Sequence, residues 1–140
     1  MEYDRLMIDE HGFVKEEGSS YVSTLQDRLI NFAVATCRIA EQLPATRVGH
    51  HAAGQLIRSC TSPAPNYGEA QGAESRRDFI HKMKVCLKEL RETHVWQTFI
   101  ERMGLTRSQE LAPLIDEADQ LIAIFVRSVL TAEQNAKHRR

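Results

Sequence analysis

Proline and glycine are scarce in this sequence, with four prolines and seven glycines among 140 residues. This scarcity favours long helices over a fold made of many short strands and turns. No run of about 18 apolar residues is present, so we expect no membrane-spanning helix. Residues 1–12 are acidic and lack an apolar core, so we expect no secretory signal peptide.

The sequence also lacks the motifs of metal sites and of common enzymes. Its three cysteines, Cys37, Cys60 and Cys86, are widely separated and form no CxxC pair. An odd number of separated cysteines indicates free thiols in a reducing cytoplasm, which is the localisation we expect. No HExxH, GxSxG or glycine-rich phosphate loop occurs. We therefore expect no bound metal, no cofactor and no catalytic activity.

The formal net charge of −1 combines an acidic leader with a mildly basic body. Residues 1–20 contain six acidic and two basic residues, a net charge of −4, whereas residues 21–140 contain 13 acidic and 16 basic residues, a net charge of +3. Dedicated nucleic-acid-binding domains are usually more basic than this. The arrangement of the basic residues therefore matters more than their number.

Apolar residues recur three and four positions apart in four segments, a spacing that places them on one face of a helix. Ser23 or Thr24 can cap the first segment, Ser75 the third and Ser108 the fourth, and proline or glycine ends two of the four segments. The expected helices cover residues 24–43, 46–73, 75–103 and 108–132. The second contains the sequence SPAPN at residues 62–66, whose two prolines remove amide donors and must kink or break the helix.

Four amphipathic helices with short connections predict an all-α fold, an antiparallel up-and-down four-helix bundle. We expect this bundle, with its kinked second helix, to form one domain over residues 22–132. Residues 1–21 show no helical period and predict an irregular N-terminal arm, with a short hairpin around His11 and Gly12 as one possible form. The polar residues 133–140 predict a frayed tail.

One face of the third expected helix carries basic residues at alternating steps of four and three. Such a row can contact successive phosphates of a nucleic acid, and each contact releases counterions. A solvated helix face without a partner is the alternative, and no interleaved aromatic row supports base stacking. Together with one flanking arginine, the candidate phosphate-contacting residues are Arg76, Arg77, His81, Lys84, Lys88 and Arg91.

The apolar face of this helix changes direction along its length. In the second half the apolar residues lie at Trp96, Phe99, Ile100 and Met103, away from the stripe of the first half. A helix with two apolar faces usually contacts two neighbours. The second neighbour is either the N-terminal arm or another subunit.

Polar and charged residues of the second and third helices predict a network across the bundle. In this network acidic side chains face Arg58 and fix the register of the helices without performing chemistry. Its expected members are Arg58, Asn66, Glu69, Glu89 and Glu92.

Residues 61–97 read TSPAPNYGEAQGAESRRDFIHKMKVCLKELRETHVWQ. This run resembles the pattern of a bacterial four-helix-bundle family related to the 23S rRNA intervening-sequence proteins and to the accessory variability determinant of diversity-generating retroelements. The matching pieces include Asn66-Tyr67 and Leu87-Lys88-Glu89. Pro65 and Gly68 depart from the pattern, in which a small residue and often a basic residue stand.

The resemblance implies a ring-like homo-oligomer, with a pentamer as the best-known form, and no enzymatic activity. It also implies binding of RNA or DNA through a basic surface, and a reverse transcriptase as a possible protein partner. Because no aromatic row is present, we expect this binding to be weak and independent of sequence. The residues that would then form the intersubunit face are Trp96, Phe99 and Met103. A protein-interaction scaffold without nucleic-acid binding is the alternative function, and neither function involves a membrane.

Overall fold

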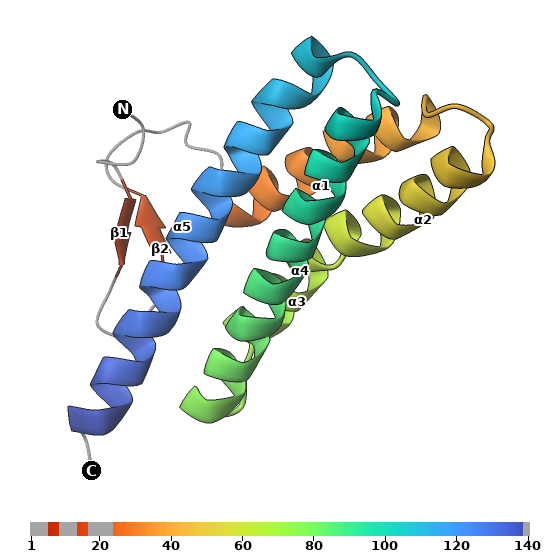
Figure 1. The fold of residues 1–140 in the computed structure, drawn as a ribbon. Coiled ribbons are helices and arrows are strands. Elements are labelled where there is room, and N and C mark those ends of the chain that lie inside the picture. The colour runs from red at the N-terminus through yellow and green to blue at the C-terminus, as the bar shows by residue number, and fades with distance from the viewer. Residues whose placement is uncertain (1–5, 9–13, 17–23, 139–140) are drawn as a thin grey trace.

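The computed structural model describes residues 6–8, 14–16 and 24–138, and the fold in these ranges is a helical bundle with a two-stranded arm (Figure 1). The arm contains β1 (Leu6–Ile8) and β2 (Val14–Glu16). The helices are α1 (Leu25–Glu41), α2 (Arg47–Thr61), α3 (Pro63–Gln71), α4 (Arg76–Met103) and α5 (Ser108–His138).

The helix boundaries follow from short polar contacts at their ends. The hydroxyls of Thr24, Thr46 and Ser75 each accept a hydrogen bond from an amide three residues on, at 3.1, 3.0 and 3.0 Å. These bonds satisfy amide groups that have no partner within the helix. At the end of α4, Gly104 adopts the left-handed conformation with φ 65°, which stops the helix. The three caps confirm the starts predicted from the sequence.

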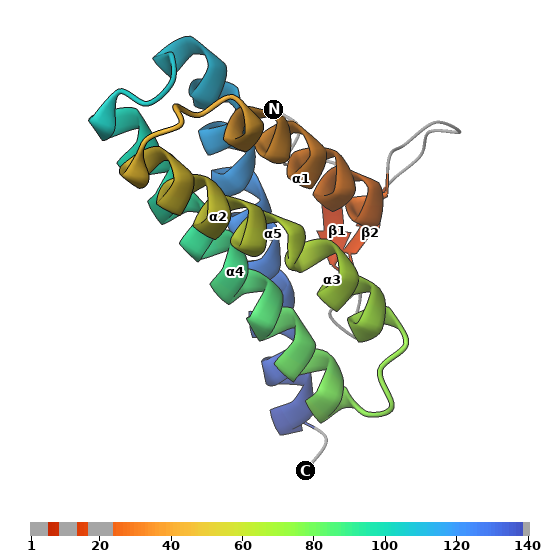
Figure 2. The ribbon, with the colours of Figure 1, turned by 90° about the vertical axis from the view of Figure 1, so that its right-hand side faces the viewer.

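The expected kink lies between α2 and α3. Ser62 keeps helical dihedral angles of −77° and −39°, and Pro63 begins the next helix with its ring in place of an amide donor. The two helices therefore form one bent unit, which lies along α4 in Figure 2. With α2 and α3 counted as one helix, the bundle has four helices, and each packs against the next along the chain. Contact between α1 and α5 closes the bundle, as predicted.

The core divides into two clusters along the bundle. The larger cluster contains Phe125 and Met83, and the ring of Phe125 meets that of Tyr67 edge to face, with centroids 5.9 Å apart. The smaller cluster surrounds Leu56 and Ile100 near the turn that joins α4 to α5. Both clusters bury side chains from α4, so this helix is held against its neighbours along its length.

The N-terminal arm is partly regular. β1 and β2 pair antiparallel, with Leu6 opposite Glu16 and Ile8 opposite Val14, so this part of the arm is a strand pair and not irregular, in line with the hairpin that the sequence left open as one form. Its turn lies outside the described residues. β1 lies beside α5 (Figure 1), so this part of the arm covers the α5 side of the bundle.

Helix α5 differs from the expectation at both ends. Ser108, the expected cap, is instead the first residue of the helix, and the carbonyl of Arg107 accepts a hydrogen bond from the amide of Leu111 at 3.4 Å. The helix continues to His138 and so includes residues 133–138, where the sequence predicts a frayed tail. In the described part of the chain no helix is both long and apolar enough to cross a membrane.

Candidate functional site

The outward face of α4 begins with a row of exposed basic side chains. Because α4 packs against α2, α3 and α5, its remaining side faces solvent, and steps of four and three residues keep one set of side chains on that side. We call this set the basic row, and it consists of Arg77, His81, Lys84, Lys88 and Arg91, all of which are exposed.

The members of the basic row differ in their ionic partners. The Nζ atom of Lys84 lies 2.6 Å from the Oε1 atom of Glu133 on α5, so part of its charge is neutralised. Within residues 24–138, no carboxylate forms an ion pair with Arg77, Lys88 or Arg91. These three side chains are therefore the ones best able to meet an external anion.

Arg76 lies outside the basic row. Its side chain is half-buried, and its Nη1 atom is buried without a hydrogen-bond partner in the described part of the protein. A guanidinium in this position contacts the bundle as well as solvent. Of the six residues expected to contact phosphate, the structure therefore presents five together on one exposed face.

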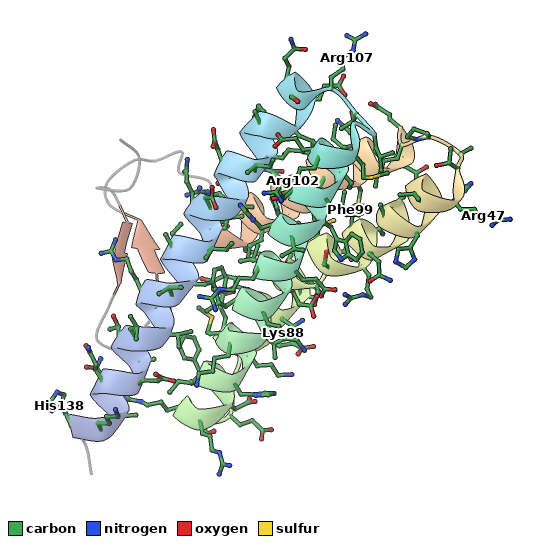
Figure 3. The ribbon with its side chains drawn as sticks, viewed as in Figure 1. Arg47, Lys88, Phe99, Arg102, Arg107 and His138 are labelled. Carbon is green, nitrogen blue, oxygen red and sulfur yellow. The ribbon has the colours of Figure 1, made fainter. Side chains whose placement is uncertain are left out.

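The same face of α4 becomes apolar in its second half. We call Val95, Phe99 and Met103 the apolar patch, and their side chains are 63%, 38% and 50% exposed. The patch lies in a shallow groove of about 600 Å³ that His94 and Arg102 also line. In Figure 3, Lys88 marks the basic half of α4 and Phe99 marks the apolar half. Val95 follows Arg91 by four residues, a spacing that places it on this face, although the sequence analysis did not single it out.

Trp96 lies behind the apolar patch. It is half-buried, and its ring packs edge to face against His51 of α2 and Phe99, with centroid distances of 5.6 and 5.5 Å. Of the three residues expected at an intersubunit face, the structure exposes Phe99 and Met103 and places Trp96 between α4 and α2. Trp96 thus positions Phe99 from within the bundle.

A charged cluster joins α2 to α4 near the middle of the bundle. The guanidinium of Arg58 donates to the carboxylates of Glu89, at 3.3 Å, and Glu92. The hydrogen bond from Arg58 holds the pKa of Glu92 below its ordinary value, and the same bond raises the pKa of Arg58. The geometry of this cluster is that of a link between α2 and α4.

Two residues that were expected in this cluster have other partners. The carboxylate of Glu69 lies 2.8 Å from the Nζ atom of Lys82, in the second turn of α4. The side-chain amide of Asn66 donates to the carbonyl and the hydroxyl of Ser62, at 2.9 and 3.0 Å. Asn66 therefore satisfies groups at the α2–α3 break, where the prolines leave the helix short of donors.

Metal ligands do not come together in the described ranges, where no group of three or more histidine, cysteine, aspartate or glutamate side chains could hold an ion. The Nε2 atom of His94 instead lies 3.1 Å from the Oδ1 atom of Asp119 on α5. This pair links α4 to α5 at the edge of the groove that contains the apolar patch.

Comparison with solved structures finds the same fold in a crystal structure from Bacteroides thetaiotaomicron, described as a protein of unknown function from the S23 ribosomal protein family. The two chains are 26% identical, with a TM-score of 0.69, and the match covers 74% of this chain and 95% of the other. No curated protein matches the chain. The family model described as 23S rRNA-intervening sequence protein matches residues 24–127, which include most of the bundle. The protein therefore belongs to the family of 23S rRNA-intervening sequence proteins.

Proposed function

We propose that this protein is a non-enzymatic homo-oligomer that binds RNA or DNA, without sequence preference, through the basic row of α4. The observation that carries the proposal is the exposure of five cationic or titratable side chains on one side of one helix. Three of them, Arg77, Lys88 and Arg91, have no ion-pair partner in residues 24–138. Charges in this arrangement bind phosphates by releasing counterions.

The length of the basic row suits a nucleic-acid strand. From Arg77 to Arg91 the helix rises about 21 Å, which corresponds to about six nucleotides along one strand of a duplex. Contacts of this kind position a backbone but do not distinguish bases. Binding through the basic row is therefore expected to be weak, sensitive to salt and independent of sequence.

The apolar patch supports the homo-oligomeric part of the proposal. Val95, Phe99 and Met103 form an exposed apolar surface on a helix whose other sides are already packed. The N-terminal arm was the other expected cover for this surface, but β1 lies beside α5. A second copy of the chain, in a ring such as a pentamer, is the cover that we propose. A reverse transcriptase or another nucleic-acid-processing protein is the class of further partner that we propose.

A protein-interaction scaffold is the second candidate, and the pairing of Lys84 with Glu133 favours it. This ion pair shows that part of the basic row is matched to the protein's own carboxylates. A scaffold would use the apolar patch in the same way but would not bind nucleic acid.

Charge reversal separates the two functions. Lys88→Glu combined with Arg91→Glu removes two cations without an ion-pair partner in residues 24–138 and leaves the Lys84–Glu133 pair intact. Arg47→Glu combined with Arg107→Glu is the matched control, because it changes the net charge equally at exposed sites that Figure 3 shows far from Lys88. Binding of labelled RNA and DNA is measured by fluorescence anisotropy at low salt, after circular dichroism has shown that both variants are folded.

We expect the variant of the basic row to lose about tenfold or more in affinity, since each phosphate contact contributes separately. The control should lose much less. Equal affinities for the wild type and the variant of the basic row would reject nucleic-acid binding through α4. The protein-interaction scaffold would then remain as the candidate function.

A further inference from the structure

Two cysteines that are 23 positions apart in the sequence meet in the structure. The Sγ atom of Cys37 on α1 lies 3.7 Å from the Sγ atom of Cys60 in the last turn of α2. Both are free thiols. The third cysteine, Cys86, has a different partner, because its thiol donates to the carbonyl of Pro63 at 3.4 Å. The fold thus selects one pair among the three cysteines.

The two paired thiols differ in their access to solvent. Cys37 is half-buried and lines a groove of about 490 Å³ beside the exposed side chains of Val34 and Arg38. Cys60 is only 1% exposed and lies behind Cys37. A small molecule that enters the groove therefore reaches Cys37 first.

Burial also separates the two thiols chemically. Desolvation raises the pKa of Cys60, and the neighbouring Cys37 raises it further. Cys60 consequently stays protonated at neutral pH. Because the thiolate is the reactive form of cysteine, the first reaction with an oxidant occurs at the accessible thiol, Cys37.

We propose that Cys37 and Cys60 form an oxidisable dithiol, which a peroxide converts into a disulfide that joins α1 to α2. In the first step Cys37 loses its proton, its thiolate attacks one oxygen of hydrogen peroxide, and the O–O bond breaks to give a sulfenic acid and hydroxide, which takes up the released proton to form water. In the second step the sulfur of Cys60 attacks the sulfenic sulfur, the S–O bond breaks, and the proton of Cys60 leaves with the oxygen as water. Two thiols lose two electrons, and one peroxide is reduced to two waters.

The two sulfur atoms must move closer together to form this bond. A disulfide has a sulfur–sulfur distance of about 2.05 Å, so the two sulfurs must approach each other from their present 3.7 Å. The groove beside Cys37 leaves space for its side chain to rotate. The resulting cross-link would hold the end of α2 to α1 directly before the break at Ser62.

The test uses the full-length protein, reduced and then treated with a small excess of hydrogen peroxide. Remaining thiols are blocked with N-ethylmaleimide before digestion with trypsin and mass spectrometry. Trypsin places the three cysteines in separate peptides, which are residues 29–38, 59–76 and 85–88. We expect peptides 29–38 and 59–76 to be joined, two hydrogens lighter than their sum, and peptide 85–88 to carry the blocking group.

Variants and unfolded protein serve as controls. Cys86→Ser should keep the cross-link, whereas Cys60→Ser should lose it and accumulate the oxidised or blocked form of Cys37. Oxidation in concentrated urea should give mixed pairs that include Cys86, because the fold no longer selects the partner. The oxidised wild type should also melt at a higher temperature than the reduced protein, and a reducing agent should reverse this shift.

Three results would overturn the proposal. The first is oxidation of Cys37 to sulfinic or sulfonic acid in the wild type without a cross-link to Cys60. The second is a cross-link that joins two chains on a non-reducing gel. The third is a pairing in the folded protein that includes Cys86.

Discussion

The Nη1 atom of Arg58 on α2 lies 3.3 Å from the Oε2 atom of Glu89 on α4. Glu89 is buried, with 8% of its surface exposed, and the same guanidinium also binds Glu92. One cation thus holds two carboxylates of the facing helix, and bonds of this kind are stronger than those between neutral groups.

Replacement of this cation should destabilise the bundle. We expect Arg58→Ala to lower the melting temperature by several degrees, because the buried carboxylate of Glu89 is left without its partner. Lys82→Ala is the control, since it breaks the more exposed pair with Glu69 and should change little. Thermal unfolding followed by circular dichroism measures the melting temperature of both variants. An Arg58→Ala protein with the melting temperature of the wild type would contradict the structural role of Arg58.

The contribution of Arg58 to the stability of the folded protein should also depend on pH. Arg58 lowers the pKa of Glu92 in the folded protein, so the unfolded chain binds a proton at the Glu92 carboxylate more tightly than the folded chain does. The stabilisation is complete above the ordinary pKa of glutamate and is lost as the pH falls through the lower folded value. The gap in melting temperature between wild type and Arg58→Ala should therefore narrow from about pH 7 to about pH 3. A gap that stays constant would show that the carboxylate of Glu92 is not its source.

The apolar patch gives a prediction about assembly. Val95→Asp places a charge at the most exposed apolar side chain of the patch and should dissociate the proposed oligomer, since an unpaired charge is costly in an interface. Leu130→Asp is the matched control, because Leu130 is similarly exposed, at 51%, on α5. Native mass spectrometry reports the subunit number of each variant. A wild-type protein that is already monomeric would reject the intersubunit role of the patch.

The salt dependence of nucleic-acid binding should distinguish members of the basic row. Removing one phosphate contact lowers the slope of log affinity against log salt by about 0.9 for duplex DNA and about 0.7 for single strands. We expect this change for Arg91→Ala and a smaller one for Lys84→Ala, because Glu133 already competes for Lys84. Titrations at several salt concentrations measure the slopes, and identical slopes for both variants would show that the ion pair does not matter.

Two glycines of α2 should respond in opposite ways to alanine. At Gly54 an added methyl group meets nothing within 4 Å, so Gly54→Ala should stabilise the helix by up to about 1 kcal/mol. At Gly49 the methyl carbon would lie 2.0 Å from the carbonyl oxygen of Pro44, so Gly49→Ala should destabilise the protein by about 1–3 kcal/mol. Urea unfolding measures both free energies, and a neutral Gly49→Ala variant would mean that the turn at Pro44 shifts without cost.

The features that the sequence predicts correctly are local ones. Helix caps and helix breaks depend on residues within one turn of each other, so the sequence is enough to predict them. The examples here are the caps at Thr24, Thr46 and Ser75 and the break at Ser62. The basic row follows from helical spacing alone, because steps of three and four fix which side chains share a face.

The contacts that the sequence does not reveal are between distant residues. From the sequence Glu69 could have paired with Arg58 or with Lys82, and in the folded protein, where α3 packs against α4, it meets Lys82. In the same way, nothing in the spacing of Cys37 and Cys60 indicates their 3.7 Å contact, which depends on how α1 packs against α2. Such choices depend on tertiary packing, which propensity and periodicity do not encode.

The order of side chains along the outer face of α4, cations first and apolar residues after them, would link the proposed assembly to the proposed binding of nucleic acid. If copies associate through the apolar half, every subunit brings its cations to the same rim of the assembly. A strand held by one subunit then meets the next at a high effective concentration, and the combined avidity can exceed a single affinity by about 10²–10⁴. Weak sites on a nearly neutral chain would then suffice for tight binding, and dissociation of the subunits would release the strand.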